Sequence, residues 1–368
     1  MSNYDDLFKK TDDELFYPKP RNNKPNDPVD TVSELAQAQK RNKQLLLVYV
    51  VAMFLVSIVS TVFVSLKYGD IAAIVDNIEI VSTPEIIVAP SLDEELPFEY
   101  QMSGTLRNGN MISLPVIYVE YYFYDAGGKV IGTYYVKAEA VASGAEFSYS
   151  ESSLFASEFV TTDYAYGFDE SPFFYLSVNL MQMAVVGMLF LLIDKRAFRK
   201  DGKDVLQAPG KALLETAIGF VLVYVAMILA QLLMQYVLGA DTASANEAVI
   251  AGMFVNKPLN LVMLFLLLCV FTPIVEEIIF RKVLCNFIEP RLGYLWAIAI
   301  SGLIFGVMHV ISYGDFVQAI PYVVMGWVFG YIYYRSKKNI FIPIGVHFVN
   351  NFLSYLLYLL PLLGYQLF

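Results

Sequence analysis

Long apolar runs dominate this sequence, and they predict a protein that crosses a membrane several times. The first run, residues 44–66, contains no charged side chain, and basic residues lie on both sides of it. Because about 20 apolar residues in a helix cross the hydrocarbon core of a bilayer, this run predicts a transmembrane anchor. Further spans are predicted near residues 173–193, 212–238, 258–289, 293–311, 317–334 and 340–366. The pattern therefore predicts an all-α polytopic bundle of about seven spans.

A different pattern fills residues 69–171, between the first two predicted spans. Every second residue from Ile117 to Phe123 belongs to one apolar set, which is the period of two typical of a β-strand. The segment Asp125–Gly128 supplies a turn, and Val130–Val136 returns as a second strand. These residues predict a β-hairpin within a small antiparallel β-sandwich.

Composition supports a membrane protein and excludes a nucleic-acid-binding one. Hydrophobic residues make up 57% of the chain, above the 45–50% of an ordinary soluble protein, and the mean hydropathy is +0.53. No basic patch interleaved with aromatic residues suggests a nucleic-acid partner. Residues 1–43 contain four prolines among charged and amide side chains, which predicts a disordered tail.

The distribution of basic residues predicts the orientation in the cell membrane. If the seven spans are correct, 20 of the 25 Lys and Arg residues lie on one side, which is therefore cytoplasmic and holds the amino terminus. The β-sandwich is then extracytoplasmic, and it is acidic, with 17 Asp and Glu against 3 Lys and Arg over residues 69–171. The predicted parts are a tail (1–43), an anchor (44–66), the sandwich (69–171) and a membrane bundle (172–368).

Two adjacent carboxylates, Glu276 and Glu277, lie inside an apolar run, in the stretch FTPIVEEIIFR. A charge at the centre of a bilayer costs about 2.5–3.5 kcal/mol or more, so buried ionisable residues indicate a functional site. Glu277 and Arg281 share a helix face at the i,i+4 spacing and can neutralise each other. Glu276 lies about 100° round the helix and needs another partner. Pro273 predicts a kink or break in this helix just before Glu276. Alternatively, the charges only mark the cytoplasmic end of a helix.

The chain has only two histidines, His309 and His347, and both lie inside apolar runs. Asn351 follows His347 by four residues and shares its helix face. Taken singly, His309 also fits a buried histidine bonded to the backbone, and the other pair fits a polar contact between spans. Together with Glu276, these side chains come from three apolar spans, and we expect them to form one hydrolytic site.

The motifs EEIIFR, FGVMH and HFVNN, in this order, resemble the signatures of the CPBP family, the type II CAAX-processing proteases and bacterial Abi proteins. The resemblance covers roughly residues 209–360 and implies an intramembrane endopeptidase. It implies that Glu276 is the general base, that His309 holds the same water, and that His347 and Asn351 donate to the oxyanion. Glu277 and Arg281 would then have a structural role.

The family has also been described as metalloproteases, in which Glu276, His309 and His347 would lie near a zinc ion. Three N/O ligands with an open water position make a permissible catalytic site. The chain has no HExxH spacing, however, and glutamate as a ligand would leave the base unassigned. We therefore favour chemistry without a cofactor and keep zinc as the alternative.

Within the insert, YVEYYFYDAGGKVIG resembles the FxLYD type of immunoglobulin-like domain on bacterial surface proteins. The resemblance covers roughly residues 97–150 and implies a binding or spacing module, with an extracellular ligand as a further partner. The expected substrate of the bundle is a peptide or protein associated with the bilayer. In a bacterial host, processing of a pheromone, bacteriocin or signal peptide fits better than a prenylated substrate.

Two other classes of function remain open. A non-catalytic receptor or bacteriocin-immunity protein would keep the helical core and bind through the sandwich. A proton-coupled transporter would use Glu276 and the histidines as a relay. The transporter reading predicts paired internal repeats with broken helices, and the sequence contains no such repeat.

Overall fold

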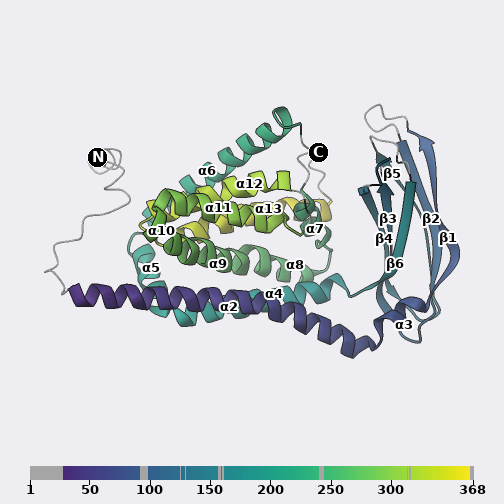
Figure 1. Cartoon of the computed structure of the whole chain (residues 1–368), viewed down its shortest axis with the longest axis horizontal. Coiled ribbons are helices and arrows are strands. Elements are labelled where there is room, and N and C mark those ends of the chain that lie inside the picture. The colour runs from purple at the N-terminus through teal and green to yellow at the C-terminus, as the bar shows by residue number, and fades with distance from the viewer. Residues whose placement is uncertain are drawn as a thin grey trace. The chain divides into compact units, whose positions relative to one another are not determined.

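The computed structural model describes residues 28–91, 98–124, 126–128, 130–155, 159, 161–239, 244–312, 314 and 316–364. The chain divides into two compact units, one formed by Met1–Val56 with Leu176–Phe368 and the other by Ser57–Tyr175. The first unit is a helix bundle and the second contains all the described strands (Figure 1). The predicted fold class, a membrane helix bundle with a small β insert, is confirmed.

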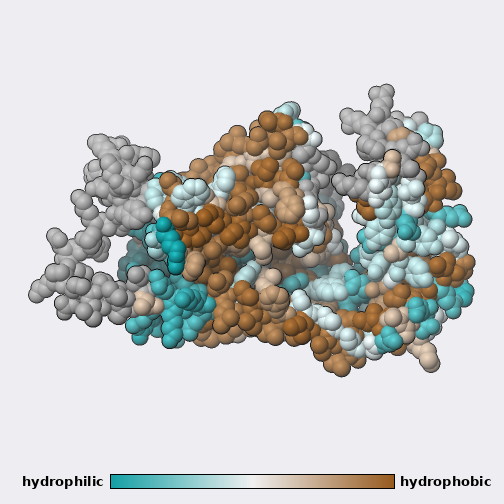
Figure 2. Space-filling model, viewed as in Figure 1, coloured by the Kyte–Doolittle hydropathy of each residue, from teal (hydrophilic) through white to brown (hydrophobic). Residues whose placement is uncertain are grey.

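Six helices in the described part of the chain are long and apolar enough to cross a membrane. They are Ala36–Tyr68, Pro172–Ile193, Pro209–Tyr236, Pro258–Leu292, Phe316–Arg335 and Phe341–Leu362. A shorter apolar helix, Tyr294–Val310, occupies the place of the predicted fifth span. Apolar side chains cover much of the bundle surface in Figure 2, as a lipid-facing surface requires. The chain is a multi-pass membrane protein, while the count of seven spans and the orientation stay predictions.

The first helix, α2 (Pro28–Tyr68), begins earlier than the tail prediction allowed. Residues 1–27 lie outside the described residues, but residues 28–43, predicted as part of a disordered tail, are helical. Alanine, glutamine and lysine each occur twice there, and these residues favour helix in front of an apolar span. The helical part of the anchor is therefore longer than its apolar run.

The remaining helices of the bundle follow in sequence order. They are α4 (Pro172–Ile193), α5 (Lys195–Gln207), α6 (Pro209–Tyr236), α7 (Ala245–Gly252), α8 (Pro258–Leu264), η1 (Phe265–Phe271), α9 (Thr272–Glu277), η2 (Ile278–Cys285), α10 (Asn286–Leu292), α11 (Tyr294–Val310), η3 (Phe316–Gln318), α12 (Ala319–Arg335) and α13 (Phe341–Leu362). The segments from α8 to α10 form one continuous helical span, in which η1 and η2 are π-helical.

Glycines allow α11 and α12 to pack closely. A Cβ atom on Gly306 would lie 2.3 Å from Cγ2 and 2.6 Å from the backbone N of Val323, and one on Gly326 would lie 2.8 Å from Cα of Gly302. Close approach through small residues is a common way for helices to associate where lipid removes the hydrophobic driving force. This contact fixes the position of His309, which follows Gly306 by less than one turn.

A buried carboxylate connects three helices at one end of the bundle. Asp194, which is 3% exposed and follows α4, lies 2.8 Å from Nζ of Lys282 and 3.2 Å from Nε of Arg41. Lys282 immediately follows the EEIIFR motif and Arg41 lies in α2. Asp194, at the end of α4, therefore links η2 to α2.

The second unit contains α3 (Ile71–Asp76) and two three-stranded antiparallel sheets, ordered β1-β2-β5 and β4-β3-β6. The strands are β1 (Ile78–Pro90), β2 (Phe98–Asn108), β3 (Leu114–Tyr124), β4 (Val130–Val141), β5 (Glu146–Phe155) and β6 (Thr161–Asp169). The predicted hairpin is β3 paired with β4, although residues 125 and 129 of its turn lie outside the described residues.

The two sheets face each other across an aromatic core. Ile117, Val119, Tyr121 and Phe123 of β3 are all fully buried, as their period of two predicted. The hydroxyl of Tyr121 lies 2.6 Å from that of Tyr149 in the other sheet. The resemblance to an FxLYD domain and the extracytoplasmic location stay predictions.

Candidate functional site

Helix α9 carries Glu276 and Glu277 between two π-helical stretches, η1 and η2. The helix continues through Pro273 and is not broken there. In η1 the backbone N–H of Thr272 donates to the carbonyl of Leu267, five residues back. The same register would bring the next nitrogen to Leu268, but that nitrogen belongs to Pro273 and has no hydrogen. The Leu268 carbonyl is therefore left without its backbone donor.

Asn351 supplies the missing donor. Its Nδ2 lies 2.9 Å from the carbonyl oxygen of Leu268, and Nδ2 of Asn350 donates to its Oδ1 at 3.2 Å. One N–H of the Asn351 side chain therefore donates to the backbone of the helical span that carries Glu276. The other N–H remains able to donate to another acceptor. Asn350 also lines the cavity described below.

Glu277 and Arg281 are both 0% exposed, and Oε2 of Glu277 lies 3.0 Å from Nε of Arg281. The arginine also donates from Nη1 to Oγ of Ser301 at 3.0 Å, and that hydroxyl donates to the carbonyl of Phe280 at 2.7 Å. Burying an ion pair costs desolvation energy that hydrogen bonds of this kind offset. The pair that the i,i+4 spacing predicted is therefore extended into α11.

Glu277 has a second partner that the sequence did not indicate. Its Oε1 lies 2.9 Å from Nδ1 of His347, and the ring of Phe329 stacks on this imidazole with 4.8 Å between centroids. A carboxylate at Nδ1 and a ring on one face fix the orientation of the imidazole. Because Glu277 also pairs with Arg281, it is an acceptor, so Nδ1 of His347 carries the hydrogen.

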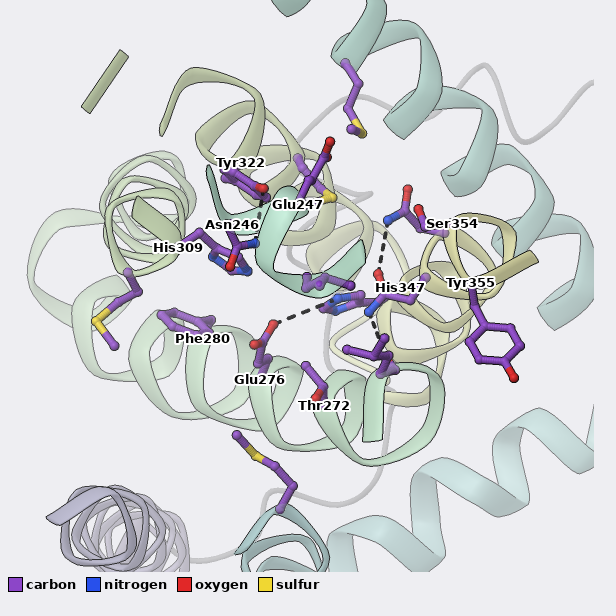
Figure 3. Close-up of a pocket in the computed structure, with 18 of the residues that line it drawn as sticks. Asn246, Glu247, Thr272, Glu276, Phe280, His309, Tyr322, His347, Ser354 and Tyr355 are labelled. Carbon is purple, nitrogen blue, oxygen red and sulfur yellow. Dashed lines mark hydrogen bonds and ion pairs between the residues drawn. The ribbon is translucent and has the colours of Figure 1, made fainter. Parts of the chain in front are cut away.

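Glu276 faces the other nitrogen of the same ring. Its Oε2 lies 3.9 Å from Nε2 of His347, too far for a hydrogen bond, and the side chain is 16% exposed (Figure 3). No hydrogen-bond partner for Glu276 Oε2 occurs among the described residues. The two adjacent glutamates thus differ: Glu277 has an ion pair with Arg281 and a hydrogen bond with His347, whereas Glu276 has only the more distant His347.

His309 presents one ring nitrogen as an acceptor. Its Nδ1 lies 2.8 Å from the carbonyl oxygen of Phe305, so Nδ1 is the donor and Nε2 carries the lone pair. The ring of Tyr322 stacks on it with centroids 4.6 Å apart and an interplanar angle of 14°. The hydroxyl of Tyr322 in turn lies 3.0 Å from Oγ of Ser244, ahead of α7. These contacts hold the imidazole in one orientation.

A cavity of about 380 Å³ collects side chains from eight helices of the bundle, with α8 to α10 counted as one span, and from the turn after α11. The side chains of all four predicted catalytic residues line it, together with methionine and tyrosine side chains and a polar group from α7. The predicted residues are Glu276, His309, His347 and Asn351; the others include Tyr49, Met53, Asn246, Glu247, Met308 and Tyr322.

The sequence did not lead us to Glu247, Ser301 and Tyr322, which lie at or beside the site. Glu247 had a detectable signal, because Ser244–Glu247 reads S-x-x-E before an apolar run, the signature of a capping box. Ser301 and Tyr322 had no detectable signal in the sequence, because a single hydroxyl side chain in an apolar run forms no recognisable pattern.

The zinc alternative depends on whether Glu276, His309 and His347 can act together as ligands. In the part of the chain that the structure describes, no three His, Cys, Asp or Glu side chains are close enough together to hold a metal ion. Each imidazole nevertheless keeps Nε2 for a ligand, because its Nδ1 is the engaged nitrogen, with a backbone carbonyl in His309 and with Glu277 in His347.

Comparison with known proteins matches a segment of the chain that contains the four predicted catalytic residues. Residues 258–353 match the family model described as type II CAAX prenyl endopeptidase Rce1-like. The chain is 28% identical over 183 residues to a Bacillus subtilis (strain 168) protein named "Putative membrane peptidase YdiL". That match covers 50% of this chain and 70% of the relative. No solved structure matches the chain significantly.

Proposed function

We propose that this chain, which resembles the type II CAAX prenyl endopeptidases of the CPBP family, hydrolyses a peptide bond of a membrane-associated peptide or protein with Glu276 as general base. The observation that carries the proposal is that Glu276 lines a cavity shared with both histidines and has a buried oxygen without a hydrogen-bond partner among the described residues. A carboxylate in this position must gain a partner that the described residues do not supply. A water molecule is the partner that peptide hydrolysis needs.

The proposed reaction uses Glu276 twice. A water molecule donates one hydrogen to the Glu276 carboxylate and the other to Nε2 of His309, the acceptor nitrogen. As the water oxygen adds to the scissile carbonyl carbon, Glu276 takes its proton. The C–N bond then breaks, and Glu276 returns this proton to the leaving amine.

The oxyanion formed in this step needs hydrogen-bond donors aimed at it. Nε2 of His347 can donate when the imidazole is protonated, and the carboxylate of Glu277 at Nδ1 holds the ring in place. Asn351 can donate with the N–H that is not bonded to Leu268. Glu277 and Arg281 act through His347 as positioning residues.

The walls of the cavity suit an apolar substrate segment. Met53, Met183, Met227, Met308 and Met325 line it, and the flexible thioether side chain of methionine adapts to different apolar groups. A peptide segment within or beside the bilayer fits such walls. The same adaptability predicts that several apolar residues are tolerated next to the scissile bond.

Mass spectrometry of peptides from reconstituted protein tests this function. We expect the wild-type protein to release defined fragments from membrane-associated peptides, and His309→Ala to reduce the rate by roughly 10²-fold or more because the water loses its acceptor. Lys211→Ala serves as the control, since Lys211 forms an exposed pair with Glu215 on α6, outside the cavity. Cleavage at an unchanged rate by His309→Ala would remove this residue from the reaction.

Metal removal gives a separate expected result. Treatment of active protein with a chelator, followed by measurement of metal content, is expected to leave the cleavage rate unchanged. Activity that disappears on chelation and returns with one equivalent of zinc would contradict the metal-independent reaction and favour the alternative.

A further inference from the structure

A second carboxylate lines the catalytic cavity, and the reaction proposed above does not use it. Glu247 lies in the first turn of α7, on the side of the cavity opposite to α9 in Figure 3. Among the described residues that line the cavity there are two carboxylates, Glu247 and Glu276, and neither lysine nor arginine. The cavity is therefore a site for a group with positive charge.

The carboxylate of Glu247 has neither an ion pair nor a hydrogen bond to any residue that the structure describes. The residue is exposed, yet it lines the cavity, so it lies where the cavity opens. Desolvation by the surrounding residues raises the pKa of this carboxyl above its ordinary value. A cationic group placed beside it would compensate for the lost hydration.

Helix α7 holds Glu247 in a fixed relation to the catalytic histidine. Nδ2 of Asn246 donates to the hydroxyl of Tyr322 at 3.2 Å, and Oγ of Ser244 lies 3.0 Å from the same oxygen. The ring of Tyr322 stacks on His309. One aromatic side chain thus joins the start of α7 to the imidazole, so a substrate group bound at Glu247 is held at a defined place relative to the scissile bond.

A structural role in helix capping is the competing explanation for this glutamate. Oγ of Ser244 accepts from the backbone N–H of Glu247 at 3.4 Å, which is half of a capping box. In the complete motif the glutamate side chain reaches back to the backbone of the first residue, and the structure contains no such bond. Glutamine caps as glutamate does, so Glu247→Gln removes the charge and keeps the capping ability.

We propose that Glu247 determines substrate specificity by binding a cationic group of the peptide, a lysine or arginine side chain or a free amino terminus, near the bond that is cleaved. The proposal rests on the proposed protease function. The predicted topology places the loop around α7 on the same side of the membrane as the acidic segment 69–171. A negative segment on that side raises the local concentration of cationic peptides.

Matched peptides test the inference. A set of membrane-associated peptides carries lysine, arginine or norleucine at one position in an otherwise identical apolar frame, and the reconstituted protein is assayed with each. We expect the wild-type protein to prefer lysine and arginine over norleucine by about tenfold in kcat/KM, mainly through KM. Glu247→Gln is expected to remove the preference and leave the norleucine peptides unaffected, and Glu247→Lys to favour peptides with aspartate at that position.

Binding measurements keep this test separate from the test of catalysis. Fluorescence anisotropy of the same peptides with Glu276→Gln protein reports binding without turnover. A preference of about tenfold in Kd for the cationic peptides, lost in Glu276→Gln/Glu247→Gln, supports the inference even if no peptide is cleaved. Equal affinity for lysine and norleucine peptides, or an equal loss for both in Glu247→Gln, overturns it. Glu215→Gln removes a carboxylate outside the cavity and is the control, expected to keep the preference.

Discussion

Glu276→Gln is expected to lower the rate of peptide cleavage by roughly 10³–10⁴-fold, the range associated with loss of a general acid–base group. The amide has almost the shape of the carboxylate but cannot take a proton from the attacking water. Because Glu276 Oε2 has no hydrogen-bond partner among the described residues, the substitution breaks no bond that supports the fold. The measurement is single-turnover cleavage of a reconstituted peptide, with thermal unfolding in detergent as the control for folding.

Glu289→Gln is the matched control for this variant. Glu289 lies in the same continuous span but outside the cavity, where it pairs with Lys338 at 2.5 Å and accepts from Tyr334. We expect its cleavage rate to stay within a few-fold of the wild type. Wild-type rates in Glu276→Gln would contradict the assignment of the base. Full complementation by this variant in an immunity or signalling assay would instead favour a non-catalytic receptor or immunity protein.

Arg281→Ala is expected to reduce the free energy of unfolding by about 3–5 kcal/mol, the cost of leaving a buried charge without its partner. The guanidinium is fully buried and bonds to both Glu277 and Ser301. Without it, the Glu277 carboxylate remains in an apolar environment with only His347 as a partner. Denaturant or thermal unfolding in detergent measures the effect, and the expected shift is a lower midpoint.

An exposed pair with the same spacing gives the control for Arg281→Ala. Lys211 and Glu215 are also four residues apart, at 3.7 Å, but the lysine side chain is 58% exposed. Exposed i,i+4 pairs contribute about 0.3–0.5 kcal/mol, so Lys211→Ala is expected to change stability little. Equal effects of the two substitutions would show that burial does not set the strength of the Arg281 pair.

The two adjacent glutamates differ because their neighbours differ. Glu277 is engaged by an arginine and a histidine, and Glu276 has only a distant imidazole and an open oxygen. One residue of helical rotation, about 100°, is enough to turn the second side chain into the packed interior and the first toward the cavity. The same separation into a structural and an available carboxylate follows from the sequence spacing.

Local patterns in the sequence are sufficient to predict much of this structure. The length of the apolar runs predicted the membrane bundle, a period of two predicted strands β3 and β4, and the i,i+4 spacing predicted the pair of Glu277 with Arg281. Each of these features depends on the geometry of one helix or one hairpin. Residues close in sequence are sufficient to specify them.

Contacts between distant segments were decided only by the tertiary structure. The bond from Glu277 to His347, the donation by Asn351 to Leu268 and the stacking of Tyr322 on His309 join separate helices. The position of Glu247 at the cavity likewise depends on how α7 packs. No periodicity in the sequence records how helices pack against one another, because packing depends on the shapes of all the side chains between them.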